Sequence, residues 1–340
     1  DAAHCCGHHA QMAGIFGAAL ALTVPEIAEK LGGQVVFFAT PAEEYGEIEF
    51  KNQLREQGKI RYGGGKCELI RTGAFDDIDL CLAHHIQPGD EIQVGSGTGN
   101  GFVSKVIRYL GKAAHAAGAP DKGVNALSAA SLGLQALGIN RETFRDEDCV
   151  RVHPIITKGG NLVNVIPDEI VIETLVRAKT IEAFTDAAKK TDRSFQAGAV
   201  AMGAKVEITT LPGYLPTLAE QALPELKRAA ELAAPEVPVR EAAGHSGGST
   251  DVGDVQHLMP VYTFNTGGVK GGLHQINFEV TNEEEAYIDT AKMFALAAYG
   301  LLKEKAARSK ELVKNYKPVF KDSAEYTKFM EQFDSKEVLD

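Results

Sequence analysis

Three short apolar runs, each followed by polar side chains that can bind a metal, constrain the fold of this chain most. The runs are residues 34–39 (QVVFFA), 79–83 (DLCLA) and 261–265 (VYTFN), which have the length and the β-branched and aromatic content of buried strands. The side chains that follow them are Glu43 and Glu44, His84 and His85, and His274 in a glycine-rich loop. Helical stretches separate the runs. We therefore predict an α/β sheet with covered faces, whose carboxyl edge collects these side chains.

Residues 101–212 have a different pattern from the segments that flank them. After a glycine-rich run at residues 95–101 we expect a strand, a helix, two strands, a helix and a strand, the order of the ferredoxin-like unit. These expected strands are residues 102–110, 150–157, 169–178 and 205–211, and the expected helices are 123–137 and 181–202. We predict a discontinuous α/β catalytic domain (1–100 and 213–340) with an inserted ferredoxin-like α+β lid domain (101–212). The charged stretch from Lys303 is predicted to be a solvated helix.

Charge and composition exclude several classes of protein. The 35 basic and 46 acidic residues give 35 − 46 = −11, which opposes binding to nucleic acid. No uncharged apolar run reaches the roughly 18 residues that would span a membrane. Five cysteines without regular spacing indicate reduced thiols and a cytoplasmic protein. Because a His/Cys cluster stands at the very start, where chain ends fray, we expect the chain to be truncated at its N-terminus.

That cluster, HCCGHH at residues 4–9, places five metal-capable side chains within six residues. Thiolate and imidazole suit zinc or manganese, and also cobalt or nickel, and Gly7 lets the chain turn so that Cys6 and His8 face one ion. Glu43 and Glu44 are neighbours on extended chain, so their side chains diverge and one is free to act beside the other. The donors match a site for two divalent ions and a bridging water, with the spare carboxylate as general base.

Five motifs in order along the chain resemble the M20 metallopeptidases, and more narrowly their amidohydrolase subfamily, with a bias toward the aminobenzoyl-glutamate hydrolase and dipeptidase branch. They are Cys6-Gly7-His8, Pro41-Ala42-Glu43-Glu44, residues 111–117 (GKAAHAA), residues 164–168 (NVIPD) and residues 249–254 (STDVGD). The resemblance implies that Glu43 is the general base. It implies five metal ligands, namely Cys6, His8, Glu44, His85 and His274. Counting six residues from Asp79 favours His85 over His84 as the ligand.

The resemblance also implies a role for the 101–212 segment. The family uses a smaller lid domain for dimerisation, and its equivalent of His115 reaches into the partner's active site to stabilise the oxyanion. Asn164 and Arg177 resemble positions that hold the carbonyl and the free carboxylate of the substrate. Gly268 belongs to a loop with several glycines, whose lack of side chains allows the close approach of a substrate. An exposed loop histidine and a surface salt bridge are the alternatives for His115 and Arg177.

Taken together, the sequence predicts an enzyme, a homodimer that hydrolyses an amide bond in a small N-acyl amino acid, an aminobenzoyl-glutamate-like compound or a dipeptide. The nucleophile is a metal-bridging water activated by Glu43. One alternative is a silent metal- or peptide-binding homologue, because His9 and Gln11 depart from the family pattern. Another is a serine hydrolase, because residues 244–248 fit G-x-S-x-G around Ser246. Residues 63–66 (GGGK) lack the spacing of a phosphate loop.

Overall fold

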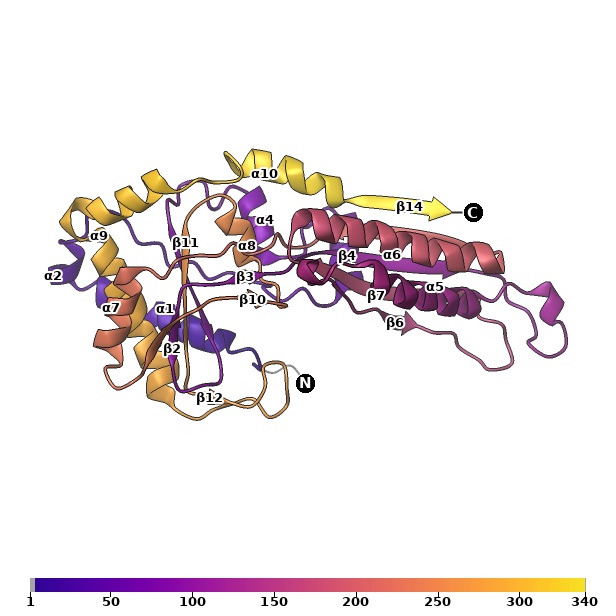
Figure 1. Ribbon diagram of the computed structural model, residues 1–340, viewed down its shortest axis with the longest axis horizontal. Coiled ribbons are helices and arrows are strands. Elements are labelled where there is room, and N and C mark those ends of the chain that lie inside the picture. The colour runs from indigo at the N-terminus through magenta and orange to yellow at the C-terminus, as the bar shows by residue number, and fades with distance from the viewer. Residues whose placement is uncertain (1–3, 340) are drawn as a thin grey trace.

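A four-stranded mixed sheet organises one half of the molecule. The computed structural model describes residues 4–339. The sheet has the order β1 (Cys81–Ile86), β11 (Val261–Thr266), β2 (Ile92–Val94), β9 (Val239–Glu241). β1 and β11 are parallel, with His85 opposite Asn265, so both strands end at the same edge. This half of the molecule lies at the left in Figure 1.

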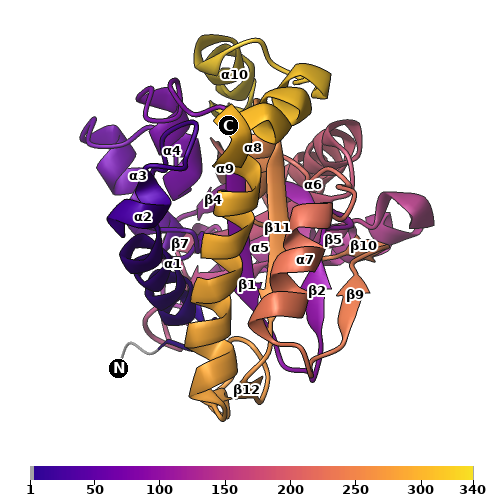
Figure 2. The ribbon, with the colours of Figure 1, turned by 90° about the vertical axis from the view of Figure 1, so that its left-hand side faces the viewer.

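Helices cover both faces of this sheet because its side chains alternate between two apolar clusters. Leu82 and Phe264 pack in one cluster with three helices, α1 (His8–Leu22), α7 (Pro224–Ala233) and α9 (Thr290–Asn315). Figure 2 shows these helices in front of the sheet. Cys81 and Val261 belong to the opposite cluster, which contains residues of α4 (Gly65–Arg71), α8 (Val252–Gln256) and α10 (Ser323–Met330). The result is a three-layered arrangement of helix, sheet and helix.

An antiparallel six-stranded sheet forms the other half, at the right in Figure 1. Its strands are β4 (Gly101–Leu110), β5 (Arg151–Val152), β6 (Ile155–Lys158), β7 (Glu169–Ala178), β8 (Lys205–Pro212) and β14 (Ser335–Leu339). The helices α5 (Ala126–Asn140) and α6 (Ile181–Met202) pack on it around Tyr109 and Phe195. Residues 101–212 thus follow the order strand, helix, strands, helix, strand that the sequence predicted. The addition of β14 beside β8 was not predicted.

Short elements complete the described chain. They are α2 (Pro25–Ala28), α3 (Ile48–Glu56), β3 (Thr98–Gly99), β10 (His245–Ser246), β12 (Val269–Lys270), β13 (Glu279–Val280), the 3₁₀ turns η1 (Pro120–Lys122), η2 (Arg141–Thr143), η3 (Asp146–Asp148) and η5 (Glu331–Phe333), and the π-helical turn η4 (Glu284–Asp289). Within residues 4–339, no helix is both long and apolar enough to cross a bilayer.

Two sequence predictions about elements are wrong. Residues 34–39 form no strand, and Val36 and Phe37 are exposed. The stretch after Lys303 is not simply a solvated helix, because helical geometry breaks at residues 303–306 and the later helix α10 buries Tyr326 completely. Charge composition misled the second prediction, because Tyr326 and Met330, four residues apart on α10, are buried although most of the helix is exposed or half-buried.

Candidate metal centre

Cys6 and His8 are brought to the same site by the conformation of Gly7. Gly7 caps the N-terminus of α1 with a left-handed φ of 74°. A β-carbon at this position would overlap the side chain of Ile86 on β1. Glycine therefore lets the start of α1 pack closely against the end of β1, with Cys6 and His8 on either side of the turn.

His85 faces the site from the end of β1, whereas His84 faces away. The Nδ1 atom of His85 lies 2.6 Å from the carbonyl oxygen of Ile86, and its Nε2 atom lies 3.5 Å from the Cys6 Sγ. His84 is buried on the opposite side of the strand, where its Nε2 atom lies 2.8 Å from the Thr266 hydroxyl. Burial lowers the pKa of His84 to about 3, so this imidazole stays neutral inside the core. Strand alternation thus separates two adjacent histidines.

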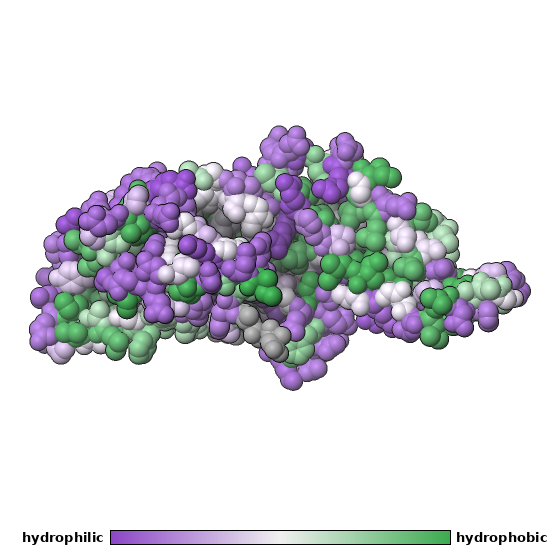
Figure 3. Space-filling model, turned by 90° about the horizontal axis from the view of Figure 1, so that it is seen from below, coloured by the Kyte–Doolittle hydropathy of each residue, from purple (hydrophilic) through white to green (hydrophobic). Residues whose placement is uncertain are grey.

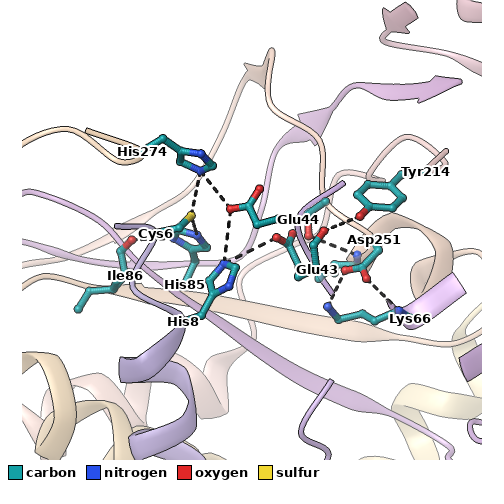
Figure 4. Close-up of polar contacts among 12 residues, drawn as sticks. Cys6, His8, Glu43, Glu44, Lys66, His85, Ile86, Tyr214, Asp251 and His274 are labelled. Carbon is teal, nitrogen blue, oxygen red and sulfur yellow. Dashed lines mark hydrogen bonds and ion pairs between the residues drawn. The ribbon is translucent and has the colours of Figure 1, made fainter. Parts of the chain in front are cut away.

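His274 reaches the cluster from the loop after β12. Its φ is 61°, an uncommon conformation for a residue with a side chain, and its backbone N–H donates to the carbonyl of Cys5 over 2.7 Å. Its Nε2 atom lies 3.2 Å from the Cys6 Sγ and 3.2 Å from Glu44 Oε1. Figure 4 shows this imidazole above Cys6 and beside Glu44. The strained backbone is held in place by the same N-terminal segment that supplies Cys6.

Glu43 and Glu44 stand on the loop before α3. Glu44 Oε1 lies 4.0 Å from His8 Nε2, and Glu43 Oε2 lies 3.7 Å from the same nitrogen. Figure 4 shows the Glu44 carboxylate between His274 and His8, and the Glu43 carboxylate also turned toward His8. Both carboxylates thus reach the same imidazole, but only Glu44 also contacts His274, so the two are able to take different tasks.

The donor atoms form three overlapping groups, and within each group they lie within 4.8 Å of one another. The groups are Cys6, His8 and His85; Cys6, Glu44 and His274; and His8, Glu43 and Glu44. Burial and the nearby Glu44 and Glu43 carboxylates raise the pKa of Cys6 to about 12. A divalent cation would reverse that effect, because it stabilises a coordinated thiolate. The donor set therefore fits one or two soft or borderline divalent ions.

A cavity of about 440 Å³ opens beside these donors. Its wall includes Tyr45, Phe102, Leu175, Arg177, Tyr214 and Ser249. The Arg177 guanidinium stands 5.6 Å from the centre of the Phe102 ring, and no carboxylate in residues 4–339 forms an ion pair with it. The surface salt bridge considered for Arg177 is therefore absent from the described chain. A partly buried, unpaired guanidinium in a cavity wall is suited to an anionic ligand.

Other predicted residues lie outside this cavity. His115 and Asn164 sit on two exposed loops that touch through Ala116 N–H and the Asn164 carbonyl, 2.9 Å apart. Gly268 lies in a turn where its carbonyl accepts from the N–H groups of Thr281 and Asn282. Neither loop nor turn contributes to the cavity wall.

The serine-hydrolase alternative has no support in the geometry. The Ser246 hydroxyl accepts from the backbone N–H of Gly248, and in the described residues no hydrogen bond joins it to a histidine. His274 is held instead among the metal-type donors.

Three residues around the site, Lys66, Asp251 and Tyr214, were not predicted from the sequence. Lys66 and Asp251 form a buried ion pair, and the Tyr214 hydroxyl donates to the carbonyl of Glu43. The motifs that contain Lys66 and Asp251 are visible in the sequence, but no spacing rule connects residues so far apart.

An α/β sheet whose edge gathers a thiol, three imidazoles and two carboxylates is the arrangement of a metal-dependent hydrolase. Residues 1–299 match the family model described as "Peptidase family M20/M25/M40". The chain is therefore a member of peptidase family M20/M25/M40, a family of hydrolytic enzymes.

Individual relatives show the same affiliation. The chain is 28% identical over 325 residues to the Xaa-Arg dipeptidase of Mus musculus, covering 93% of this chain and 67% of the mouse protein. It is 30% identical over 176 residues to one of the p-aminobenzoyl-glutamate hydrolase subunits of Escherichia coli, covering 52% and 32% of the two chains. A dinuclear metal binding peptidase of the M20 family from Bacillus subtilis has a similar fold, with a TM-score of 0.56, 23% identity and coverage of 88% of this chain and 73% of that one.

Proposed function

We propose that this protein hydrolyses an amide bond in a small N-acyl amino acid, an aminobenzoyl-glutamate-like compound or a dipeptide. The observation that carries the proposal is the convergence of Cys6, His8, Glu44, His85 and His274 from four separate segments of the chain. These five residues would hold two divalent ions, zinc or manganese, with cobalt or nickel as alternatives. Such ions would supply Lewis acidity toward a carbonyl and lower the pKa of water.

Glu43 is the proposed general base. Its carboxylate lies at the edge of the donor cluster and in the cavity wall, while Glu44 turns toward His274. Glu43 takes a proton from the attacking water and gives it to the departing amine, so one carboxylate serves both halves of the reaction.

Arg177 is proposed to bind a carboxylate of the substrate. Its guanidinium is unpaired in the described chain and stands in the cavity wall, and it matches a carboxylate with two parallel hydrogen bonds. The names of the relatives, a dipeptidase and an aminobenzoyl-glutamate hydrolase, agree with a substrate that carries a free carboxylate. Gly268 is also proposed as a substrate-binding position, although its turn does not line this cavity.

Residues 101–212 are proposed to be the lid and dimerisation domain, inserted between residues 1–100 and 213–340 of a cytoplasmic enzyme. β6 exposes Ile155 and Ile156. Figure 3 shows apolar residues gathered on the right-hand half of the face seen from below. Covering this surface with a second copy would remove it from water. His115 and Asn164 would then act in the site of the partner subunit.

Chelation tests the proposal. We expect the purified protein to lose hydrolysis of acyl-amino acids and dipeptides after chelation and to regain it with Zn²⁺ or Mn²⁺. Glu43→Gln should lower kcat roughly 10²- to 10⁴-fold because the base is lost, without lowering the metal bound per chain. Glu47→Gln, an exposed change on the same loop, is the control. Activity that survives chelation, or full activity of Glu43→Gln, would overturn the mechanism. The absence of hydrolysis under every condition would favour the alternative of an inactive metal- or peptide-binding homologue.

A further inference from the structure

The loop that carries Glu43 rests on the glycine run at residues 63–65, which the proposed reaction does not use. The N–H of Gly65 donates to the carbonyl of Ala42 over 3.1 Å. A β-carbon on Gly65 would overlap the carbonyl oxygen of Pro41. The backbone of the glycine run therefore packs directly against the loop of Glu43, since only glycine permits such a close approach of two backbones.

Lys66, the next residue, connects the glycine run to Asp251, which directly precedes α8. Its backbone N–H donates to Asp251 Oδ2 over 2.9 Å, and its Nζ lies 2.5 Å from Asp251 Oδ1. Asp251 is completely buried, and only 18% of the Lys66 side chain is exposed. One carboxylate thus holds both the first turn of α4 and the end of the Lys66 side chain.

Tyr214 holds the loop from the other side. Its hydroxyl donates to the carbonyl oxygen of Glu43, and a β-carbon at Gly64 would overlap its ring. Figure 4 shows Tyr214, Asp251 and Lys66 together around Glu43. The backbone of Glu43 is therefore fixed by contacts from two separate segments.

Charge balance gives the ion pair a second effect. Burial raises the pKa of Asp251, and the negative charge of Glu43 raises it further. The positive charge of Lys66 and its hydrogen bonds lower the pKa again. Without Lys66, a buried carboxylate would stand unpaired beside the proposed base.

We propose that Lys66 and Asp251 are a positioning pair, which orients the loop of Glu43 for proton transfer. This inference rests on the function proposed above for Glu43. Neither residue lies in the cavity wall, so the pair acts through the loop and not on the substrate.

The test compares this pair with a second buried Lys–Asp pair. Lys105, on strand β4, is 1% exposed, and its Nζ lies 2.8 Å from Asp192 on α6. Lys66→Met and Asp251→Asn should lower kcat roughly 10- to 100-fold with KM changed by less than about 2-fold, because a small displacement of a reacting group has effects of that size. Lys105→Met should leave kcat near the wild-type value, and Lys66→Arg should restore much of the loss.

Hydrogen exchange supplies a readout that needs no turnover. Amides of residues 40–47 should exchange faster in Lys66→Met than in wild type, with no such change in Lys105→Met. Equal loss of kcat in both lysine variants, or unchanged exchange of the loop in Lys66→Met, would overturn the positioning role. If the wild-type protein shows no hydrolysis, the proposed function fails, while the exchange comparison still decides whether the pair fixes the loop.

Discussion

Gly7 determines the geometry of the centre without contributing a donor atom. It adopts a φ that other residues avoid, and it allows contact with Ile86 at the end of β1. Cys6 and His8, on its two sides, both belong to the donor groups. A change at this position should therefore affect stability and metal binding together.

Gly7→Ala should lower the free energy of unfolding by about 1 to 3 kcal/mol, the usual cost of backbone strain, and should weaken metal binding. The matched control is Gly138→Ala in α5, where the added β-carbon meets nothing within 4 Å. That control should raise stability by roughly 0.5 to 1 kcal/mol, as in other helices. Denaturant unfolding and metal titration measure both effects, and equal stabilities of the two variants would contradict the role of Gly7.

At the scale of single residues, the sequence predicted which side chains are metal-type donors, but it did not predict which distant residues form ion pairs. Thiol, imidazole and carboxylate groups at the ends of apolar runs indicated a metal centre, and the structure gathers five of them with Glu43. The ion pair of Lys66 and Asp251 was invisible, because its members lie 185 residues apart and no local pattern connects them.

At the scale of elements, residues 34–39 show the limit of local pattern. Their β-branched and aromatic side chains favour extended backbone, but a strand also needs a neighbour that accepts and donates hydrogen bonds. No backbone hydrogen bond pairs this segment with another strand in residues 4–339. It lines an apolar groove of about 750 Å³ together with residues 79–82 and part of α9.

An unpaired apolar segment of this kind promotes association of chains. Val36→Glu should therefore slow aggregation on heating, because it places a charge in the exposed segment. Leu232→Glu is the control, since Leu232 on α7 and Val36 are each 51% exposed. Light scattering during a thermal ramp measures the rates. An equal reduction in both variants would indicate that net charge alone, and not the segment, controls aggregation.

At the scale of the whole molecule, the chain closes each half with segments from distant parts of the sequence. β14, near the end of the chain, pairs with β8, although the sequence assigned residues 213–340 to the other half. Glu220 likewise connects two segments, since its N–H donates to the carbonyl of Ser96 and its carboxylate accepts from Thr263 N–H on β11. Burial raises the pKa of this carboxyl to about 9, so it is protonated in the folded protein at neutral pH.

The raised pKa of Glu220 predicts how stability varies with pH. The unfolded chain releases this proton above the ordinary pKa, near 4.5, whereas the folded chain holds it until about pH 9. The contribution of the Glu220 carboxyl to the free energy of unfolding is therefore fully present below about pH 4.5. It falls as the pH rises toward 9, by up to about 1.4 kcal/mol per pH unit. Glu220→Gln should flatten this decline between pH 5 and 9, while Glu26→Gln, at an exposed position, should not. Parallel slopes for wild type and Glu220→Gln in denaturant unfolding would contradict the assignment.

The position of His115 outside the cavity wall of its own chain leads to a prediction about assembly. His115 lies on an exposed loop outside that cavity, and in the dimer proposed above it would act in the site of the second copy. His115→Ala and Glu43→Gln should then each be nearly inactive, because each removes one half of a shared site. In a one-to-one mixture that exchanges subunits, half of the dimers are mixed and each has one intact site, so about a quarter of wild-type activity should return. Activity that stays at the level of the separate variants, or a fully active His115→Ala, would show that each chain works alone.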